Sequence, residues 1–207
     1  DNNHNEIQTN GARAALRLDL DDTWTVTPML TWQSQDADGS FASDPLLGER
    51  KIARYVKEYN EDEWYQAALT VEGKIGNFDV IYSGGYLDRS VDNSYDYADY
   101  SYFYDYTYAA YPEYFGNYFV DNAGDFVNPA QYTINRADYT KQTHEFRISS
   151  PGDQKLRWVA GLFLQKQTNK GQYAYRVDGL ADDHSITGQP GVNYLQSTEQ
   201  DTTDRAI

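Results

Sequence analysis

Apolar and polar residues alternate along several stretches of this chain, and the longest such stretch spans residues 140–169. Phe146 and Ile148 alternate with Glu145 and Arg147, which is the period of two that a β-strand imposes on its two faces. Ser-Pro-Gly-Asp at 150–153 supplies turn chemistry. The apolar side of the alternation resumes at Leu156, Trp158, Ala160, Leu162 and Leu164. The pattern predicts a long antiparallel hairpin over about residues 141–167.

Two similar hairpins are predicted nearer the N-terminus. One covers about residues 12–33, with its turn at Asp21 and Asp22, and the other covers about residues 64–87, with its turn at 73–77. Pro28 lies inside the first hairpin, and we expect an irregularity there because proline cannot donate to a strand ladder. Residues 1–10 are predicted to form a loop, whereas residues 201–207 resemble the beginning of a further strand.

The connections between these elements are strongly unequal in length. The turns have about four residues, whereas the other connections cover about residues 34–62, 88–139 and 168–200. Bacterial outer-membrane barrels combine short periplasmic turns with long extracellular loops, while soluble sandwiches have comparable loops at both ends. Strands of about ten residues also match the length needed to cross a bilayer. We predict one all-β unit over residues 1–207, an antiparallel transmembrane β-barrel represented here by a partial segment of about six strands.

Aromatic residues mark the two ends of the predicted apolar faces. Trp24 and Trp32 are eight residues apart on one face, as are Phe78 and Tyr86. At about 3.3 Å per residue and a tilt near 40°, this spacing projects to roughly 20 Å, close to the apolar band of about 25 Å in membrane barrels. The predicted lipid-facing aromatic girdle consists of Trp24, Trp32, Tyr65, Phe78, Tyr86 and Trp158. The alternative is a soluble sandwich in which these rings pack into a protein core.

Composition and charge exclude several other classes of protein. The mean hydropathy is −0.80 and no apolar run of about 18 residues exists, which excludes a helical membrane span. With 17 basic and 32 acidic residues the net charge is −15, which repels phosphate backbones and argues against nucleic acid as a partner. The chain has no cysteine, so disulfides, thiolate metal sites and cysteine nucleophiles are excluded.

Charged residues on the other face of the strands are expected to meet water or protein inside the barrel. The predicted lumen-facing residues are Arg13, Arg17, Glu145, Arg147 and Arg157. Ion pairing within the lumen is the default expectation for them, and contact with a ligand or with a plug domain is the alternative.

The stretch 94–119 is rich in tyrosine, and half of the 20 tyrosines lie between Tyr95 and Tyr118. Five of these tyrosines alternate with other residues along the chain. If the stretch formed a β-hairpin extension, their rings would project to one side of it, where they could stack against a ligand. The alternative is that the rings pack on neighbouring loops and stiffen them. The predicted ligand-binding residues are Tyr95, Tyr97, Tyr100, Tyr102, Tyr104, Tyr106, Tyr108 and Tyr111.

The sequence offers no catalytic or metal-binding pattern. His4, His144 and His184 lie in three different segments, and none has a partner at metal-ligand spacing. Asp96, Asp99 and Asp105, like the DADGS fragment at 36–40, do not fit a calcium loop. No nucleophile elbow or phosphate-binding glycine loop is present. We expect no catalytic residues, no cofactor and no bound metal.

Three stretches of the chain resemble a known family. THEFRISSPGDQKLRWVAGLFLQKQ at 143–167, GKIGNFDVIYSGGYLDRS at 73–90, and SYFYDY followed by NPAQYTINRADYTKQ are similar to the barrel region of TonB-dependent outer-membrane receptors, particularly those of sphingomonad and caulobacter-like proteobacteria. The resemblance implies a barrel of about 22 strands closed by a plug domain. No TonB box, no plug-like stretch and no final strand ending in an aromatic residue is found here, so the chain is expected to be a middle segment.

The resemblance also implies a function and a location. It implies active uptake of a scarce small molecule, most often a ferric siderophore, across the outer membrane of a Gram-negative bacterium, with outer-membrane lipid and the TonB energy-coupling complex as partners. Six strands are fewer than the smallest bacterial barrels contain, which agrees with a segment of a larger barrel. The alternatives are a soluble secreted β-module that binds carbohydrate through its tyrosines and an outer-membrane enzyme, which would need a clustered catalytic set.

Overall fold

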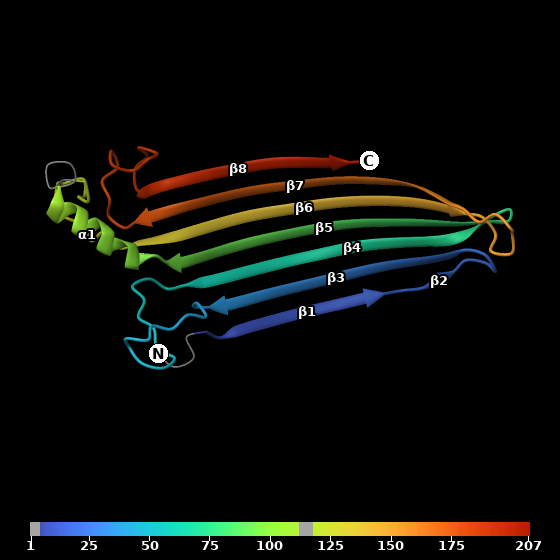
Figure 1. The fold of residues 1–207 in the computed structure, drawn as a ribbon, viewed down its shortest axis with the longest axis horizontal. Coiled ribbons are helices and arrows are strands. Elements are labelled where there is room, and N and C mark those ends of the chain that lie inside the picture. The colour runs from blue at the N-terminus through green and yellow to red at the C-terminus, as the bar shows by residue number, and fades with distance from the viewer. Residues whose placement is uncertain (1–4, 112–117) are drawn as a thin grey trace.

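The computed structural model describes residues 5–111 and 118–207, which form one antiparallel sheet with a short helix at one end (Figure 1). The strands are β1 (Ile7–Ala15), β2 (Leu18–Asp19), β3 (Thr25–Asp38), β4 (Tyr59–Ile75), β5 (Phe78–Asp96), β6 (Gln131–Ser149), β7 (Val159–Val177) and β8 (Tyr194–Ala206). A 3-10 helix, η1 (Ala98–Tyr100), leads into α1 (Ser101–Ala110). No helix in the described ranges is both long and apolar enough to cross a membrane.

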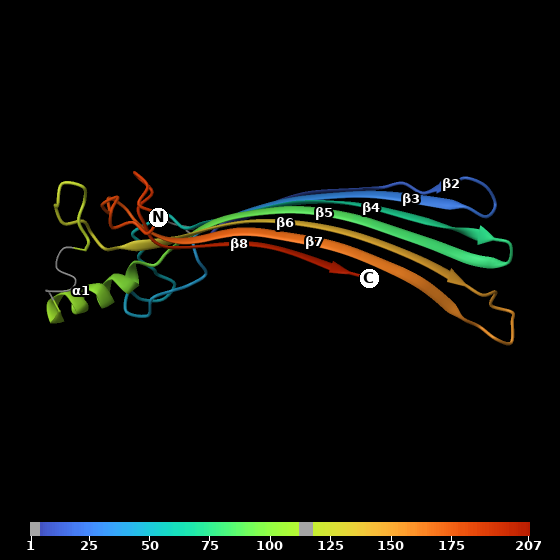
Figure 2. The ribbon, with the colours of Figure 1, turned by 90° about the horizontal axis from the view of Figure 1, so that it is seen from above.

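The sheet is a meander in which strands adjacent in the chain pair with one another. The order is β1-β3-β4-β5-β6-β7-β8, and β2 pairs with β3 beyond the end of β1. The predicted all-β antiparallel fold is confirmed, with eight strands where about six were predicted. Among the described residues β1 and β8 form opposite edges and do not pair, so the sheet is open. Figure 2 shows it as one curved, twisted layer, with the tight turns at one end and α1 and the long connections at the other.

The strands extend beyond their predicted limits toward the end of the sheet that carries α1, which we call the loop end. β3 continues to Asp38, β5 to Asp96 and β7 to Val177, and β1 begins at Ile7, inside a stretch predicted to be loop. The long connections shrink to residues 39–58, 97–130 and 178–193, so their predicted limits are wrong. Both faces of these extensions are largely polar, so no alternation marks them, although the backbone pairing continues in register.

The third turn is longer than its sequence suggests. β6 ends at Ser149 and β7 begins at Val159, so Leu156, Arg157 and Trp158 lie in the connection and not in the predicted strand. Ser150 closes this connection, because its backbone N–H donates to the Trp158 carbonyl at 3.0 Å and its hydroxyl accepts from the Trp158 N–H at 2.9 Å. The prediction that Arg157 faces a lumen from within a strand is therefore wrong in its placement, because Arg157 lies in the connection.

The irregularity expected at Pro28 occurs in the neighbouring strand. Pro28 pairs in register with Leu69 of β4, and its carbonyl accepts from the Leu16 N–H at 3.1 Å. The return bond to the Leu16 carbonyl is absent because proline has no N–H to donate. The edge strand is interrupted there, between Ala15 at the end of β1 and Leu18 at the start of β2.

The register assigns every strand residue to one of two faces, because directly paired residues point to the same side of a sheet. Trp32 pairs with Tyr65, and Tyr86 pairs with Ala67, so these residues share what we call face A. Arg13 and Glu145 belong to the opposite side, which we call face B. The apolar sides of all three predicted hairpins fall on face A.

The buried apolar cluster of this fold is small and lies at the loop end. Phe119, Val177 and Leu180 are almost fully buried there. Tyr118 stacks on His184 with ring centroids 5.4 Å apart, and the Tyr118 carbonyl lies 2.6 Å from Nδ1 of that histidine. The cluster therefore joins the connection 97–130 to the connection 178–193, while the strands are held mainly by their backbone ladders.

Gly73 supplies the space for a ring at the turn end of face A. A Cβ at this position would lie 2.3 Å from the Trp24 ring, which is far inside van der Waals contact. We expect Gly73→Ala to displace Trp24 and to lower the free energy of unfolding by about 1–3 kcal/mol. Thermal unfolding followed by tryptophan fluorescence measures this effect. Gly152→Ala is the matched control, since nothing lies within 4 Å of its added Cβ, and an equal loss in both variants would contradict the contact.

Candidate functional site

Face A carries large apolar side chains that nothing covers in the described structure. Leu16 is 57% exposed, Leu69 is 38% exposed and Leu162 is 54% exposed. The sandwich alternative requires these side chains to pack against a second sheet, but the described strands all belong to one sheet. Within the described residues, face A is thus an extended apolar surface that no second sheet covers.

Aromatic residues limit this apolar surface at both ends, and its limits run obliquely across the strands. Trp24 and Trp32 lie eight residues apart on β3, and Phe78 and Tyr86 lie eight residues apart on β5. At the loop-end limit Trp32 pairs with Tyr65 of β4, whereas Tyr86 pairs with Ala67, which is two residues nearer the turn. At the turn-end limit Thr25 pairs with Glu72, so Trp24 lies one residue beyond that level, whereas Phe78 pairs with Ile75, two residues further toward the turn. The aromatic pair on β5 is therefore displaced by two residues toward the turns at both limits. The apolar surface is therefore a band of constant width, which we call the apolar band.

The displacement gives the angle between the band and the strands. Two residues along a strand are about 6.6 Å, and two strand spacings are about 9.6 Å, so the strands are inclined by about 35° to the normal of the band. Strands of membrane barrels are tilted by about 35–45°. Eight residues are about 26 Å long and project at this angle to about 22 Å, near the roughly 25 Å apolar height of such barrels.

The rings at the limits of the apolar band make the contacts expected at a boundary between apolar and polar surroundings. At the loop-end limit, Trp32 donates from Nε1 to Glu63 at 2.8 Å, and the Tyr86 hydroxyl donates to Asp88 at 3.1 Å. At the turn-end limit, the rings of Phe78 and Trp158 lie 5.6 Å apart. The polar atoms of Trp32 and Tyr86 are thus directed to carboxylates beyond the loop-end limit of the band.

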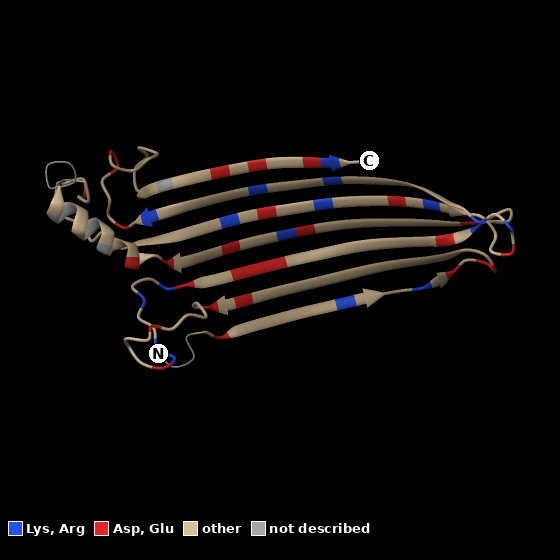
Figure 3. Ribbon diagram, in the orientation of Figure 1, with Lys and Arg blue, Asp and Glu red and all other residues tan. Residues whose placement is uncertain are grey.

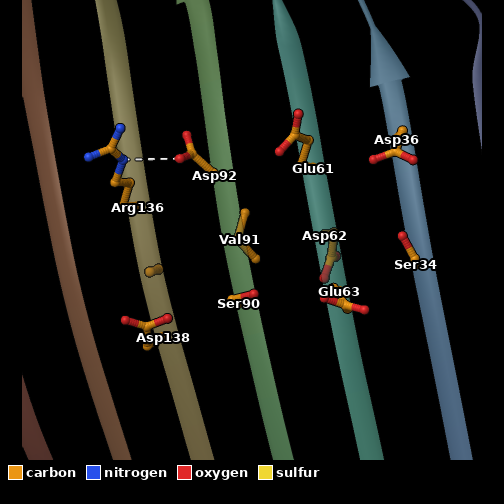
Figure 4. Close-up of a pocket in the computed structure, with 11 residues that line it drawn as sticks. Ser34, Asp36, Glu61, Asp62, Glu63, Ser90, Val91, Asp92, Arg136 and Asp138 are labelled. Atoms are coloured by element: carbon orange, nitrogen blue, oxygen red, sulfur yellow. Dashed lines mark hydrogen bonds and ion pairs between the residues drawn. The ribbon is translucent and has the colours of Figure 1, made fainter.

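Face A becomes acidic directly beyond the loop-end limit of the apolar band. Figure 3 shows acidic residues on several neighbouring strands in this region, and Figure 4 shows side chains that line a depression within it. Arg136 pairs with Asp92 at 3.0 Å, and the Tyr59 hydroxyl donates to the same carboxylate at 3.0 Å. The two rows of paired residues nearest the band contain Glu63, Asp138, Lys170, Asp201, Asp36, Glu61, Asp92, Arg136 and Glu199.

Face B carries most of the charged residues that were predicted to face a lumen. Arg147 pairs with Glu145 at 2.8 Å on β6, and Arg13 lies on β1 opposite Thr31. Arg17 lies in the interruption between β1 and β2 and pairs with Asp19 at 3.1 Å. Ion pairing between neighbours is thus observed for three of the five residues.

Another group of face B residues, nearer the loop end, was missed in the sequence. Arg89 makes a two-pronged contact with Asp62, at 2.8 and 2.5 Å, and its guanidinium lies 5.8 Å from the Tyr139 ring centroid. Beyond this pair, three asparagines stand side by side on neighbouring strands: Asn60, Asn93 and Asn135. Asparagine is common in loops, so only the register of the extended strands reveals this row.

The tyrosine-rich stretch does not extend the β-hairpin. Tyr95 is the last but one residue of β5 and lies on face B, and the segment after Tyr97 forms η1 and α1, so the prediction that alternating tyrosines share one side is wrong. A helix turns by about 100° per residue and spreads alternate residues around its axis. Tyr106 and Tyr111 are exposed, at 67% and 54%. The side chains of Tyr102, Tyr104 and Tyr108 lie outside the described residues.

A chain of ring contacts connects face B to the start of α1, and we call it the aromatic track. Tyr173 contacts Tyr175 at 5.3 Å between centroids, and Tyr175 contacts Tyr97 at 5.2 Å. The track continues from Tyr97 to Tyr100 at 5.5 Å and from Tyr100 to Phe103 at 5.4 Å. The nearby Tyr175 hydroxyl and the loss of solvent around the ring raise the pKa of Tyr97 above its ordinary value.

Asp96 organises the backbone around the track. Its carboxylate accepts hydrogen bonds from the N–H groups of Tyr55, Val56 and Ala98, and thereby ties the connection 39–58 to η1. Its own N–H donates at 3.2 Å to Glu58, a buried carboxylate that also pairs with Arg54. The sequence pattern at Asp96 was weighed only against a calcium loop, so its structural role was missed.

His144 and His184 lie in different parts of the fold, whereas His4 and the side chain of Asp105 lie outside the described residues. Nδ1 of His144 lies 2.8 Å from the Tyr82 hydroxyl on face A, whereas His184 belongs to the cluster at the loop end. Asp99 is exposed, and its carboxylate lies 4.0 Å from Arg54. No group of three or more potential metal ligands was found among the described residues.

Comparison with known proteins does not assign this chain to a family, because neither the models of protein families nor the curated proteins contain a match. The function is therefore argued from the two faces of the sheet and from the aromatic track.

Removal of the Asp96 carboxylate tests the organisation of the loop end. We expect Asp96→Ala to speed tryptic cleavage after Arg50, Lys51, Arg54 and Lys57 several-fold, because three backbone N–H groups lose their acceptor. A time course of limited proteolysis measures the effect. Asp99→Ala is the control, since that carboxylate is 98% exposed, and an equal acceleration in the control would contradict the role given to Asp96.

Proposed function

We propose that this chain forms part of the wall of a TonB-dependent receptor that imports a scarce small molecule across the outer membrane of a Gram-negative bacterium. The observation that carries the proposal is the apolar band, which has aromatic limits, a constant width and an oblique course across the strands. A planar hydrocarbon layer that meets tilted strands requires all three features. The resemblance of residues 73–90 and 143–167 to such receptors points to the same class.

A soluble protein has no comparable reason for such a band. Exposed apolar patches on soluble monomers rarely exceed a few hundred Å², and larger ones mark an interface. A protein partner would cover the apolar residues in a patch of irregular outline, whereas here the limit shifts by the same two residues at both ends. The soluble secreted module is therefore the weaker candidate.

The proposal gives each end of the sheet a location. The short turns face the periplasm, the connections 39–58, 97–130 and 178–193 face the cell exterior, and face B lines the passage. Open strand edges in lipid leave N–H and C=O groups unpaired, so β1 and β8 pair with further strands of the barrel. Uptake proceeds by binding and by plug movement driven through TonB, without covalent chemistry, and a ferric siderophore is the ligand most typical of the receptors that the sequence resembles.

Charge introduced on the two faces of β4 tests the proposal. Leu69 lies within the apolar band on face A, and Thr70 is its neighbour on face B. We expect Leu69→Arg to destabilise the protein in lipid vesicles by about 2–4 kcal/mol and to lower its amount in the outer-membrane fraction, because the charge enters hydrocarbon. Thr70→Arg is the control and should have a smaller effect. Equal losses in both variants, or complete protein that purifies from aqueous extract without detergent, would contradict the membrane assignment.

A further inference from the structure

The two faces differ sharply in charge beyond the loop-end limit of the apolar band. Face A there has seven carboxylates and two basic groups in two rows. On the described part of face B, the four rows that begin at Gln33, Gln35, Ala37 and Tyr95 contain only two charged residues, Arg89 and Asp62, which neutralise each other through a two-pronged contact. A chain with a net charge of −15 thus keeps one nearly neutral surface.

This neutral surface is rich in groups that both donate and accept hydrogen bonds. Asn60, Asn93 and Asn135 stand in one row, in which Asn60 and Asn135 are half-buried and Asn93 is buried, and the next residue of that row is Tyr173 on β7. Each amide offers two donor hydrogens and one acceptor oxygen, in a geometry that suits adjacent hydroxyl groups. Amides and hydroxyls in the four rows include Gln33, Gln35, Asn60, Asn93, Asn135, Asn169, Thr198, Gln200 and Thr202.

The aromatic track begins in the asparagine row. Tyr173 pairs directly with Asn135 and is 40% exposed, and the ring contacts lead from it through Tyr175 to Tyr97, also 40% exposed. Successive rings about 5 Å apart offer a series of flat apolar surfaces, each with a polar edge. A ligand made of linked rings that carry hydroxyl groups matches this combination, because its C–H faces stack on the rings while its hydroxyls bond to amides.

We propose that the loop end of face B binds a neutral oligosaccharide or a similar uncharged, hydroxyl-rich ligand along the aromatic track. This names the ligand class of the proposed receptor and rests on that proposal for the route of uptake, although binding itself does not require a membrane. An anionic ferric chelate needs an excess of positive charge, and the single cation in these rows of the described surface, Arg89, is committed to Asp62.

The test compares two classes of probe on the complete purified protein. Calorimetry with neutral malto-, cello- and xylo-oligosaccharides of six or so units forms one arm, and calorimetry with anionic ferric citrate and a ferric tris-catecholate forms the other. We expect saturable binding in the first arm alone, weakened about tenfold or more by Tyr97→Ala and by Tyr173→Ala, because each removes a stacking surface. Tyr97→Phe should retain most of the affinity, since the ring remains.

Tyr55→Ala serves as the control, because that side chain is 78% exposed in the connection 39–58 and no ring contact is found for it among the described residues. Circular dichroism of each variant confirms its folding. Binding of the ferric chelates alone, binding of neither class, or an equal loss in the Tyr55→Ala control would overturn the ligand class. If the protein binds oligosaccharide but is soluble in water without detergent, the ligand class stands and the receptor proposal is contradicted. If it is a membrane protein that binds only ferric chelates, the receptor proposal stands and the ligand class is contradicted.

Discussion

The fold depends on backbone hydrogen bonds between neighbouring strands, because a single sheet has no second layer to pack against. Once the register is set, it assigns each side chain to one of two faces, and a slip of one residue would exchange them. The apolar residues of all three hairpins then lie on face A, where Leu16, Leu69 and Leu162 remain exposed. Their exposure in water costs about 25 cal/mol for each Å² of apolar surface, so a partner that covers the apolar band of face A would stabilise the sheet.

The shape of the apolar band indicates what that partner is. The band keeps the same eight-residue spacing on β3 and β5, and both of its limits shift by two residues between these strands. A layer with two parallel surfaces produces this pattern when strands cross it at an angle. The contacts of Trp32 with Glu63 and of Tyr86 with Asp88 place the polar atoms of the limiting rings toward the acidic part of face A. The proposed membrane, a hydrocarbon layer with water beyond it, would account for both observations.

The sequence predicts the part of the sheet whose two faces differ in polarity. The alternation at Phe78 to Tyr86 and at Phe146 to Ile148 identified these strands and their two faces correctly. It could not predict the extensions, such as residues 88–96 of β5, because both faces are polar there and backbone pairing alone continues the strand. Nor could it predict α1, since alternating tyrosines imitate a strand and the hydrogen bond from the Ala98 N–H to the Asp96 carboxylate belongs to no recognised pattern. The asparagine row and the aromatic track depend on these same extensions and on η1, which is why the neutral surface was missed.

Spin-label accessibility along β3 and β5 tests the central claim most directly, and the absence of cysteine from the chain allows single labelled cysteines to be introduced without other changes. The account predicts that labels at even positions from 26 to 30 on β3 and from 80 to 84 on β5 are reached by oxygen dissolved in lipid, while the odd positions between them are reached by a water-soluble nickel complex or are buried. It also predicts that the limits of the oxygen-accessible zone differ by two residues between the strands. Access of the nickel complex to the even positions, or limits without that displacement, would contradict the account.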